Sequence, residues 1–200
     1  EYLPGNDQSE LFDVETVVQS DDWIAFDQLV PNLGLGDRFR WMRLTLDPRT
    51  ENGKLIEIQN AGIDDLTCYM VCDGKVISNY SAGIMNAVHE GQQFGTYPSF
   101  PIPLVECAQL QALFRLQSNK PMLIPLRISG PRRVLEDSHK RDVLFGIYAG
   151  VMLVMILYNL FLFLSIGDRS YLEYVFFIFA VGGTQLVLNG YGPIFNVEKW

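Results

Sequence analysis

Two acidic pairs are the residues in this 200-residue chain whose spacing could most directly serve catalysis. Asp21-Asp22 and Asp64-Asp65 could supply carboxyl groups for glycoside hydrolysis, which needs two of them facing each other across a cleft at about 5–10 Å. Adjacent residues of a strand point to opposite faces, so neither pair makes this arrangement alone. The chain also has no nucleophile elbow, phosphate-binding loop or zinc-protease motif. We therefore expect no enzymatic activity from these residues.

Aromatic rings and planar polar side chains favour a binding function instead. Sugars stack their apolar faces on rings, and a few placed polar groups fix their orientation. The candidate ligand-binding residues are Trp23, Trp41, Arg43, Tyr69, Arg115 and Gln117. Both arginines lie in segments typical of central strands, so we expect them on one concave face or paired with acids, because an unpaired buried charge is costly. Each tryptophan could instead belong to the core. This alternative is favoured for Trp41, whereas for Trp23 the core and the binding surface are equally favoured.

Loop carboxylates leave a structural calcium ion open, and no other cofactor is expected. The oxygen donors are Asp21, Asp22, Asp64, Asp65 and Asp73, and none of them has the spacing of an EF-hand. The net charge of −8 includes seven acids and no base between residues 1 and 22, which opposes nucleic-acid binding.

The three cysteines fit no zinc or redox motif. Cys68 and Cys72 would lie about 13 Å apart on one strand, too far for a disulfide. Either could pair with Cys107 if the fold brought them together, and an odd count leaves one thiol free. Buried small hydrophobes are the favoured alternative, and the pairing stays open at this point.

Short β-prone runs must position these side chains. The runs are Phe12–Val18, Trp23–Phe26, Phe39–Leu46, Leu55–Gln59, Leu66–Val71, Lys75–Ser78, Phe100–Val105, Leu110–Gln117 and Met122–Ile128. Asp73-Gly74 is a two-residue hairpin signal. Leu110, Ala112, Phe114 and Leu116 alternate with polar residues and are expected to face the core. Eight or nine strands at roughly ten-residue spacing predict an antiparallel β-sandwich or jelly roll.

A membrane hairpin is predicted after the β-rich part. Residues 143–166 carry no charged side chain, and a helix of that length would span roughly 36 Å, enough for a hydrocarbon core of about 30 Å. A second span is expected over 171–190. The preceding chain divides into an acidic lead-in (1–20), a β-sandwich sensor domain (21–130) and a juxtamembrane linker (131–142). The chain is expected to be truncated, with further helices beyond it.

Small and polar residues within the two spans predict helix–helix packing. Small residues let helices approach closely, and a polar side chain in a span should point to another helix rather than to lipid. The predicted packing residues are Gly146, Gly150, Asn159, Gly182 and Gly183. Asp168 or Ser170 is expected to cap the second helix.

Several motifs resemble the bacterial seven-transmembrane receptors with diverse intracellular signalling modules. The hairpin carries Gly146, Tyr158-Asn159-Leu160-Phe161-Leu162-Phe163, Asp168-Arg169-Ser170-Tyr171-Leu172, Tyr174 and Asn189-Gly190. The preceding domain carries Trp41-Met42-Arg43, Gly91, Pro98-Ser99-Phe100-Pro101 and Phe114-Arg115-Leu116-Gln117-Ser118. This second set resembles that family's second type of extracellular domain.

The resemblance implies a periplasmic sensor domain, similar to carbohydrate-binding modules, on a bacterial inner-membrane receptor. A cytoplasmic output such as a diguanylate cyclase or histidine kinase would follow the seven helices. Arg132, Arg133, Lys140 and Arg141 precede the first span, and the positive-inside rule alone would place the β domain in the cytoplasm. Translocation of a large domain by an upstream signal peptide overrides that rule. The expected partners are a small-molecule or glycan ligand and the membrane, with a second copy or a periplasmic protein as a further candidate. The alternative function is a protein-interaction module without a small ligand.

Overall fold

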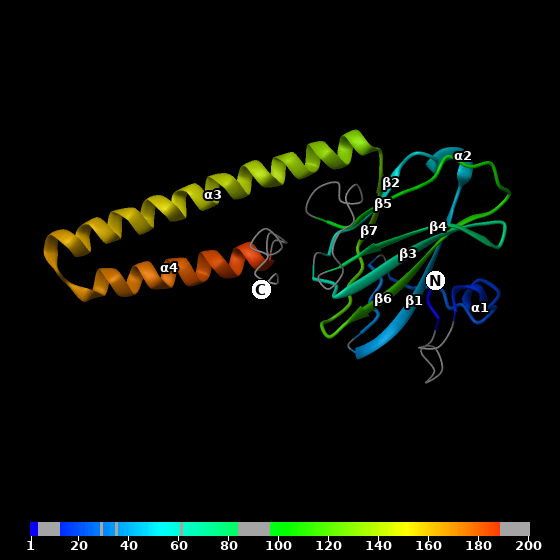
Figure 1. Ribbon diagram of the computed structural model, residues 1–200, viewed down its shortest axis with the longest axis horizontal. Coiled ribbons are helices and arrows are strands. Elements are labelled where there is room, and N and C mark those ends of the chain that lie inside the picture. Colours follow the sequence, from blue (N-terminus) through cyan, green and yellow to red (C-terminus); the bar gives the residue numbers. More distant parts are fainter. Residues whose placement is uncertain (4–12, 29, 35, 61, 84–96, 189–200) are drawn as a thin grey trace. The chain divides into compact units, whose positions relative to one another are not determined.

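Two antiparallel sheets make up the part of the chain before the long helix (Figure 1). The computed structural model describes all residues except 4–12, 29, 35, 61, 84–96 and 189–200, and the chain divides into two units, Glu1–Val134 and Leu135–Trp200. The four-stranded sheet has the order β1 (Gly36–Leu46), β6 (Leu110–Ser118), β3 (Asp65–Cys72), β4 (Lys75–Ala82). The three-stranded sheet has the order β5 (Ser99–Pro101), β2 (Leu55–Ile58), β7 (Leu126–Ser129).

The core lies between the two sheets, which makes the domain a β-sandwich. The four-stranded sheet contributes Met42, Phe114 and Met70, and the three-stranded sheet contributes Ile56 and Phe100, all at 0–1% exposure. Alternate residues of a strand face opposite sides of the sheet, so one row of apolar residues per strand is enough to fill this layer.

The predicted alternation in β6 is confirmed. Leu110, Ala112, Phe114 and Leu116 are all fully buried in the core between the sheets. The hairpin between β3 and β4 is also confirmed, because Asp73 (φ 47°) and Gly74 (φ 79°) both take the left-handed backbone that a type I′ turn requires.

The prediction of a strand over Phe12–Val18 is wrong, because these residues include the helix α1 (Val14–Val18). The Asp13 carboxylate caps α1 by accepting a hydrogen bond from the main-chain N–H of Val14. Valines at positions 14, 17 and 18 share one helix face, and that spacing outweighs the β-propensity of single valines. The run Trp23–Phe26 is not a strand either, since only Ile24 makes an isolated bridge, to Tyr2.

Residues 1–20, expected as a weakly patterned lead-in, include chain segments that pack on the sandwich. Leu3 and Val17 are 8% and 1% exposed. Tyr2 pairs with Met42 of β1, and the Leu3 N–H donates to the Trp41 carbonyl at 3.1 Å. The first residues therefore extend the four-stranded sheet beyond β1.

Two short elements complete the first unit. The helix α2 (Pro48–Glu51) follows β1 directly, and its capping residue Asp47 accepts a hydrogen bond from the Arg49 N–H. Proline at the first helical position suits this start, because its missing N–H would be unpaired there in any helix. α2 places Arg49 and Asn52 at one end of the sandwich.

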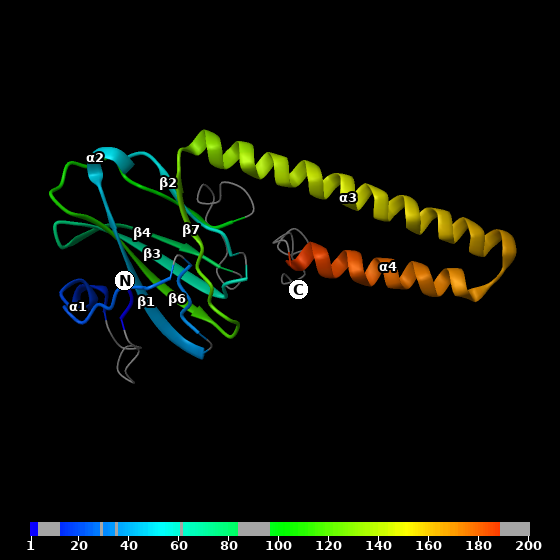
Figure 2. The ribbon, with the colours of Figure 1, turned by 180° about the vertical axis from the view of Figure 1, so that it is seen from behind.

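A long helix, α3 (Pro131–Ile166), begins directly after β7 (Figure 2). Residues 131–142, expected as a linker, form its first turns. From the described residues, α3 is the helix long and apolar enough to cross a membrane, and only 6% of its most apolar stretch is buried. The helix α3 ends at Ile166, the residue where the first span was predicted to end.

A tight connector joins α3 to α4 (Arg169–Leu188). Gly167 has φ 80°, and its N–H donates to the Phe163 carbonyl at 2.8 Å. A glycine in the left-handed conformation thus ends α3, as is common at helix C-termini. The predicted cap by Asp168 is confirmed, since its carboxylate accepts hydrogen bonds from the N–H and hydroxyl of Ser170, both at 2.9 Å. Residues 189 and 190 of the predicted second span lie outside the described residues.

Candidate functional site

The outer face of the four-stranded sheet, which is turned away from the core, brings most of the predicted binding residues together. Strand register places Trp41 beside Arg115, Arg115 beside Thr67, and Thr67 beside Ser81. A second row runs from Arg43 through Leu113 and Tyr69 to Asn79, and Gln117 lies beside Asp65. Residues paired in neighbouring strands point to the same face, so these side chains share one surface.

The N-terminal residues cover the part of this face around Trp41 in β1, Leu113 in β6 and Val71 in β3. Trp41 is 2% exposed and packs in a cluster with Leu3, Val17 and Leu113. The ring centroid of Tyr69 lies 5.9 Å from that of Trp41. The core alternative for Trp41 is thus confirmed, and its ring is closed to solvent in this structure. We call these residues the covered half.

Arg43 and Trp23 meet at the edge of the covered half. The Arg43 guanidinium lies 4.5 Å from the centre of the Trp23 ring, and its Nη2 forms an ion pair with Glu1 at 2.6 Å. The Arg43 Nε donates to the same carboxylate at 2.7 Å. The expectation that this arginine would be paired with an acid is confirmed. Trp23 is half-buried and is shielded on one side by the guanidinium.

The rest of the outer face is polar and open, and we call it the open half. Here the Arg115 guanidinium lies 3.6 Å from the centre of the Phe39 ring, which holds it flat on the sheet. Thr67 and Ser81, its neighbours along the row, are half-buried, as is Gln117. A planar guanidinium with hydroxyl and amide groups beside it can donate and accept several hydrogen bonds at once.

The open half therefore contains two of the six predicted residues, Arg115 and Gln117, with Tyr69 at its boundary. Sequence reasoning missed Phe39, Thr67 and Ser81 as members of this surface. The period-two alternation in each strand predicts which face of the sheet each side chain points to. It does not predict which strands are neighbours. That information comes only from the order β1-β6-β3-β4.

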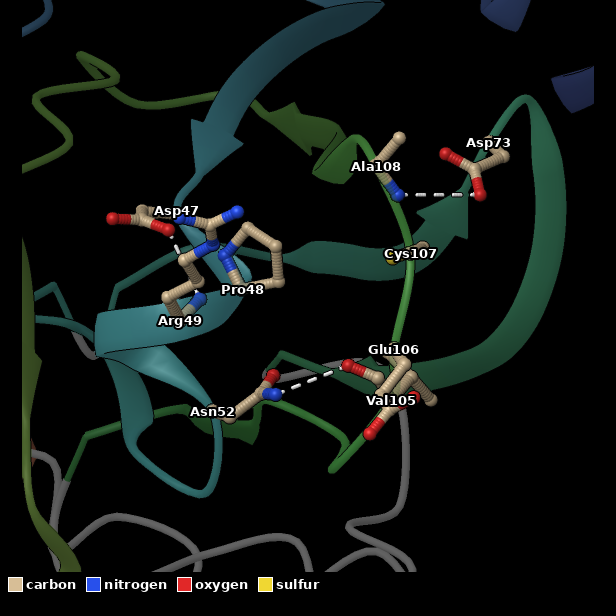
Figure 3. A pocket seen from close by; sticks show the side chains of 9 residues that line it. All are labelled: Asp47, Pro48, Arg49, Asn52, Asp73, Val105, Glu106, Cys107 and Ala108. Atoms are coloured by element: carbon tan, nitrogen blue, oxygen red, sulfur yellow. Dashed lines mark hydrogen bonds between the residues drawn. The ribbon is translucent and has the colours of Figure 1, made fainter.

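A hollow of about 970 Å³ lies at the end of the sandwich where α2 begins (Figure 3). One wall contains Asp47, Pro48, Arg49 and Asn52, and the other contains Asp73 and the segment Val105–Ala108. The Asn52 amide donates to the Val105 carbonyl at 3.0 Å and so connects the two walls. Its described lining residues are mostly polar and supply carboxylates, an amide and a guanidinium.

Two of the acidic residues considered for calcium, Asp64 and Asp73, accept hydrogen bonds from the chain itself. Asp64 accepts hydrogen bonds from the Ser118 hydroxyl at 3.2 Å and from the Asn119 N–H at 3.0 Å. Asp73 accepts from the Gln109 N–H at 2.9 Å. Across the described parts of the chain, no three acidic, histidine or cysteine side chains gather where they could hold a metal ion. A structural calcium ion stays a prediction.

The predicted packing residues of the helices have different surroundings. A Cβ atom at Gly182 would contact the Met152 side chain at 3.5 Å, so α4 meets α3 there. Among the described residues, no atom lies within 4 Å of such a Cβ at Gly146, Gly150 or Gly183. Asn159 is 7% exposed, and its amide donates to the Met155 carbonyl of the same helix at 2.8 Å.

Comparison with known protein families agrees with this division of the chain. Residues 1–130 match the family described as 7TMR-DISM extracellular 2, and residues 141–199 match the family described as 7TM diverse intracellular signalling. The chain belongs to the 7TMR-DISM receptors. Its β-sandwich is the extracellular sensory domain of a seven-helix signalling receptor, and its C-terminal hairpin is the start of the membrane region. No curated protein matches the chain.

The family and the structure together identify the function of each unit in general terms. The 7TMR-DISM sandwich is an input module rather than a catalytic one, and α3 connects it to the membrane region. Apolar side chains on α3 are widely exposed, such as Leu144 at 68% and Leu164 at 74%. Exposed apolar surface on all sides of a helix suits lipid rather than water.

Proposed function

We propose that the sandwich senses a small hydroxyl-rich ligand of the carbohydrate type, bound on the open half of its outer face. The receptor would lie in a bacterial inner membrane with this domain in the periplasm. The observation that carries the proposal is the row formed by Arg115, Thr67 and Ser81 across three strands, with Gln117 beside it. Such a row offers donors and acceptors that repeat at the strand spacing of about 4.8 Å. A ligand with several hydroxyl groups could bind to more than one of them at once.

The position of Arg115 adds a second reason. Its stacking on Phe39 fixes the guanidinium plane, so less side-chain freedom is lost when a ligand binds. A flexible arginine would lose about 0.5–1.5 kcal/mol of free energy on being immobilised, and a held one loses less. The open half is therefore the better organised of the two polar surfaces.

A direct path along the chain supports coupling to the membrane. β7 ends at Ser129, and α3 begins at Pro131 and continues unbroken to Ile166. Val134, in the first turns of α3, is 2% exposed and belongs to the first unit. A ligand changes the state of the receptor only through its different affinity for two arrangements of the domain, and a helix anchored in the sandwich can transmit such a change.

A thermal-shift screen of the domain Glu1–Val134 tests the proposal. The panel contains mono- and oligosaccharides, each with and without calcium. A ligand at 100 times its dissociation constant should stabilise the folded state by roughly 2.7 kcal/mol. The Arg115→Ala and Gln117→Ala variants should lose this shift, whereas Arg49→Ala, which alters the hollow, should keep it.

Other outcomes of the same screen have distinct meanings. Loss of the shift in Arg49→Ala alone would move the ligand to the hollow. Loss in Trp23→Ala or Arg43→Ala alone would place it at the edge of the covered half. The absence of any shift, with a domain that melts cooperatively, would refute the ligand proposal.

The second candidate function is association with a protein partner or a second copy. Among the described residues, β4 ends the four-stranded sheet and exposes Val76 at 39% and Ile77 at 42%. An exposed edge strand can pair with a strand of another chain. Sedimentation of the domain, with Ile77→Lys as the variant, would separate the two functions, because only pairing through β4 depends on that side chain.

A further inference from the structure

We propose that Cys72 and Cys107 form a disulfide bond in the exported receptor. The bond would fasten the segment 102–109, which joins β5 to β6, to the hairpin of β3 and β4. The sequence allowed either Cys68 or Cys72 as the partner of Cys107, and the fold selects Cys72. The inference depends on the extracellular placement of the domain and not on the ligand proposed above.

The register of the strands brings the two cysteines to the same end of the sandwich. Cys72 is the last residue of β3 and pairs with Leu110, the first residue of β6. Cys107 precedes Leu110 by three residues. Because the chain enters β6 beside the end of β3, the segment that carries Cys107 must pass close to Cys72.

Asp73 holds that segment in place. Its main-chain N–H donates to the Gln109 carbonyl at 3.0 Å. Its carboxylate accepts from the Gln109 N–H at 2.9 Å. The same carboxylate accepts from the Ala108 N–H at 3.4 Å (Figure 3). Three hydrogen bonds from the residue next to Cys72 therefore fix the residues next to Cys107.

The two thiols lie on neighbouring segments at the same end of the sandwich. Cys72 and Cys107 are both half-buried and pack against the core between the sheets. Burial, the neighbouring Cys72 thiol and the nearby charge of Asp73 raise the pKa of Cys107 to about 11. Neighbouring segments of this kind can meet the Cα separation of about 4.4–6.8 Å that a disulfide needs. Cys68, by contrast, is completely buried within β3.

The oxidation is balanced by thiol–disulfide exchange with a second protein. A thiolate of the pair attacks the disulfide of an oxidising donor protein, and the other cysteine then displaces the donor. The two thiols lose two protons and two electrons in total, and the donor disulfide is reduced to a dithiol. Such donors act where proteins are exported, and structural disulfides persist there. The high pKa of Cys107 leaves little thiolate in the folded domain, so the exchange is expected during folding.

The bond would act on the hollow described above. Val105, Glu106, Cys107 and Ala108 form one of its walls, and the opposite wall belongs to α2 and the residue before it. Anchoring Cys107 to the end of β3 would hold that wall at a constant position. The disulfide would thus stiffen the rim of the hollow as well as the domain.

Peptide mapping of the exported receptor tests the inference. Cells are lysed with an alkylating reagent that blocks free thiols, and the receptor is digested without reduction by a protease that cuts after Tyr69, so that Cys68 and Cys72 lie on different peptides. Mass spectrometry should find the Cys72 and Cys107 peptides joined, with a mass lower by two hydrogens than the sum of the reduced peptides. Cys68 should be alkylated only when the receptor is unfolded first.

Matched variants make the result specific. Cys68→Ser should leave the linked peptide unchanged. Cys107→Ser should leave Cys72 free, and Cys72→Ser should leave Cys107 free, so that each gains one alkylated site. The inference is overturned if wild-type receptor, trapped at lysis, carries alkyl groups on both Cys72 and Cys107, or if Cys68 is found in the linked peptide. The mapping of the wild-type receptor decides this even if a variant fails to fold.

Discussion

Replacing Gly83 with alanine should destabilise the sandwich more than any other glycine substitution in its described residues. Gly83 follows β4 and has φ 122°, a conformation that costs a residue with a side chain about 1–3 kcal/mol. An added Cβ would lie 2.6 Å from the Asp64 carbonyl oxygen and 3.1 Å from the Asp65 Cα. Both neighbours are backbone atoms, so the strand itself must shift, which adds a further 1–3 kcal/mol. We expect a total loss of about 2–6 kcal/mol.

Gly74→Ala is the matched control, because Gly74 also has a positive φ (79°) but no atom of the described residues lies within 4 Å of its added Cβ. It should cost only about 1–2 kcal/mol. Urea denaturation of the domain Glu1–Val134 measures both. With a slope of about 1.5 kcal/mol per molar urea, the midpoint should fall by roughly 1.3–4 M for Gly83→Ala and by about 1 M for Gly74→Ala. Equal losses in the two variants would refute the contact with Asp64 as the cause.

Three further predictions concern the core, the covered half and the helix connector. Phe114→Ala removes a fully buried ring and should lower the unfolding free energy by about 3–5 kcal/mol, as measured by urea denaturation; a loss below 1 kcal/mol would contradict its place in the core. Arg43→Ala removes the ion pair with Glu1 and should cost about 1 kcal/mol, and the cost should shrink in high salt; a cost independent of salt would exclude the ion pair as its source. Hydrogen bonds from the N–H and hydroxyl of Ser170 lower the pKa of Asp168, so Ser170→Ala should raise it partway, as measured by NMR titration in micelles. Because the lowered pKa favours the folded connector, this contribution is present above the ordinary carboxyl pKa and is lost as the pH falls through the lowered value.

Local patterns in the sequence were sufficient for the elements whose partners are near in the chain. Asp73-Gly74 predicted the β3–β4 hairpin because only residues tolerant of positive φ form that turn. The alternation in Leu110–Gln117 predicted which side chains enter the core, since a strand turns every second residue to the same face. The strand predicted over Phe12–Val18 is wrong because it also relied on a local pattern. Valine favours strands, and the valine spacing of a five-residue helix is too short a signal to be recognised in the sequence.

The sequence by itself determined that a β-sandwich precedes a membrane hairpin, because alternation and an uncharged run of 24 residues are properties of neighbouring residues. Only the tertiary structure decided which side chains share a surface. Arg115 lies beside Thr67, Trp41 lies under the N-terminal residues, and Cys72 rather than Cys68 lies at the end of β3 beside the start of β6. These pairings depend on the order of strands that are distant in the chain. That order is selected by the packing of the whole core. No single segment contributes enough of the packing free energy for the order to be predicted from that segment alone.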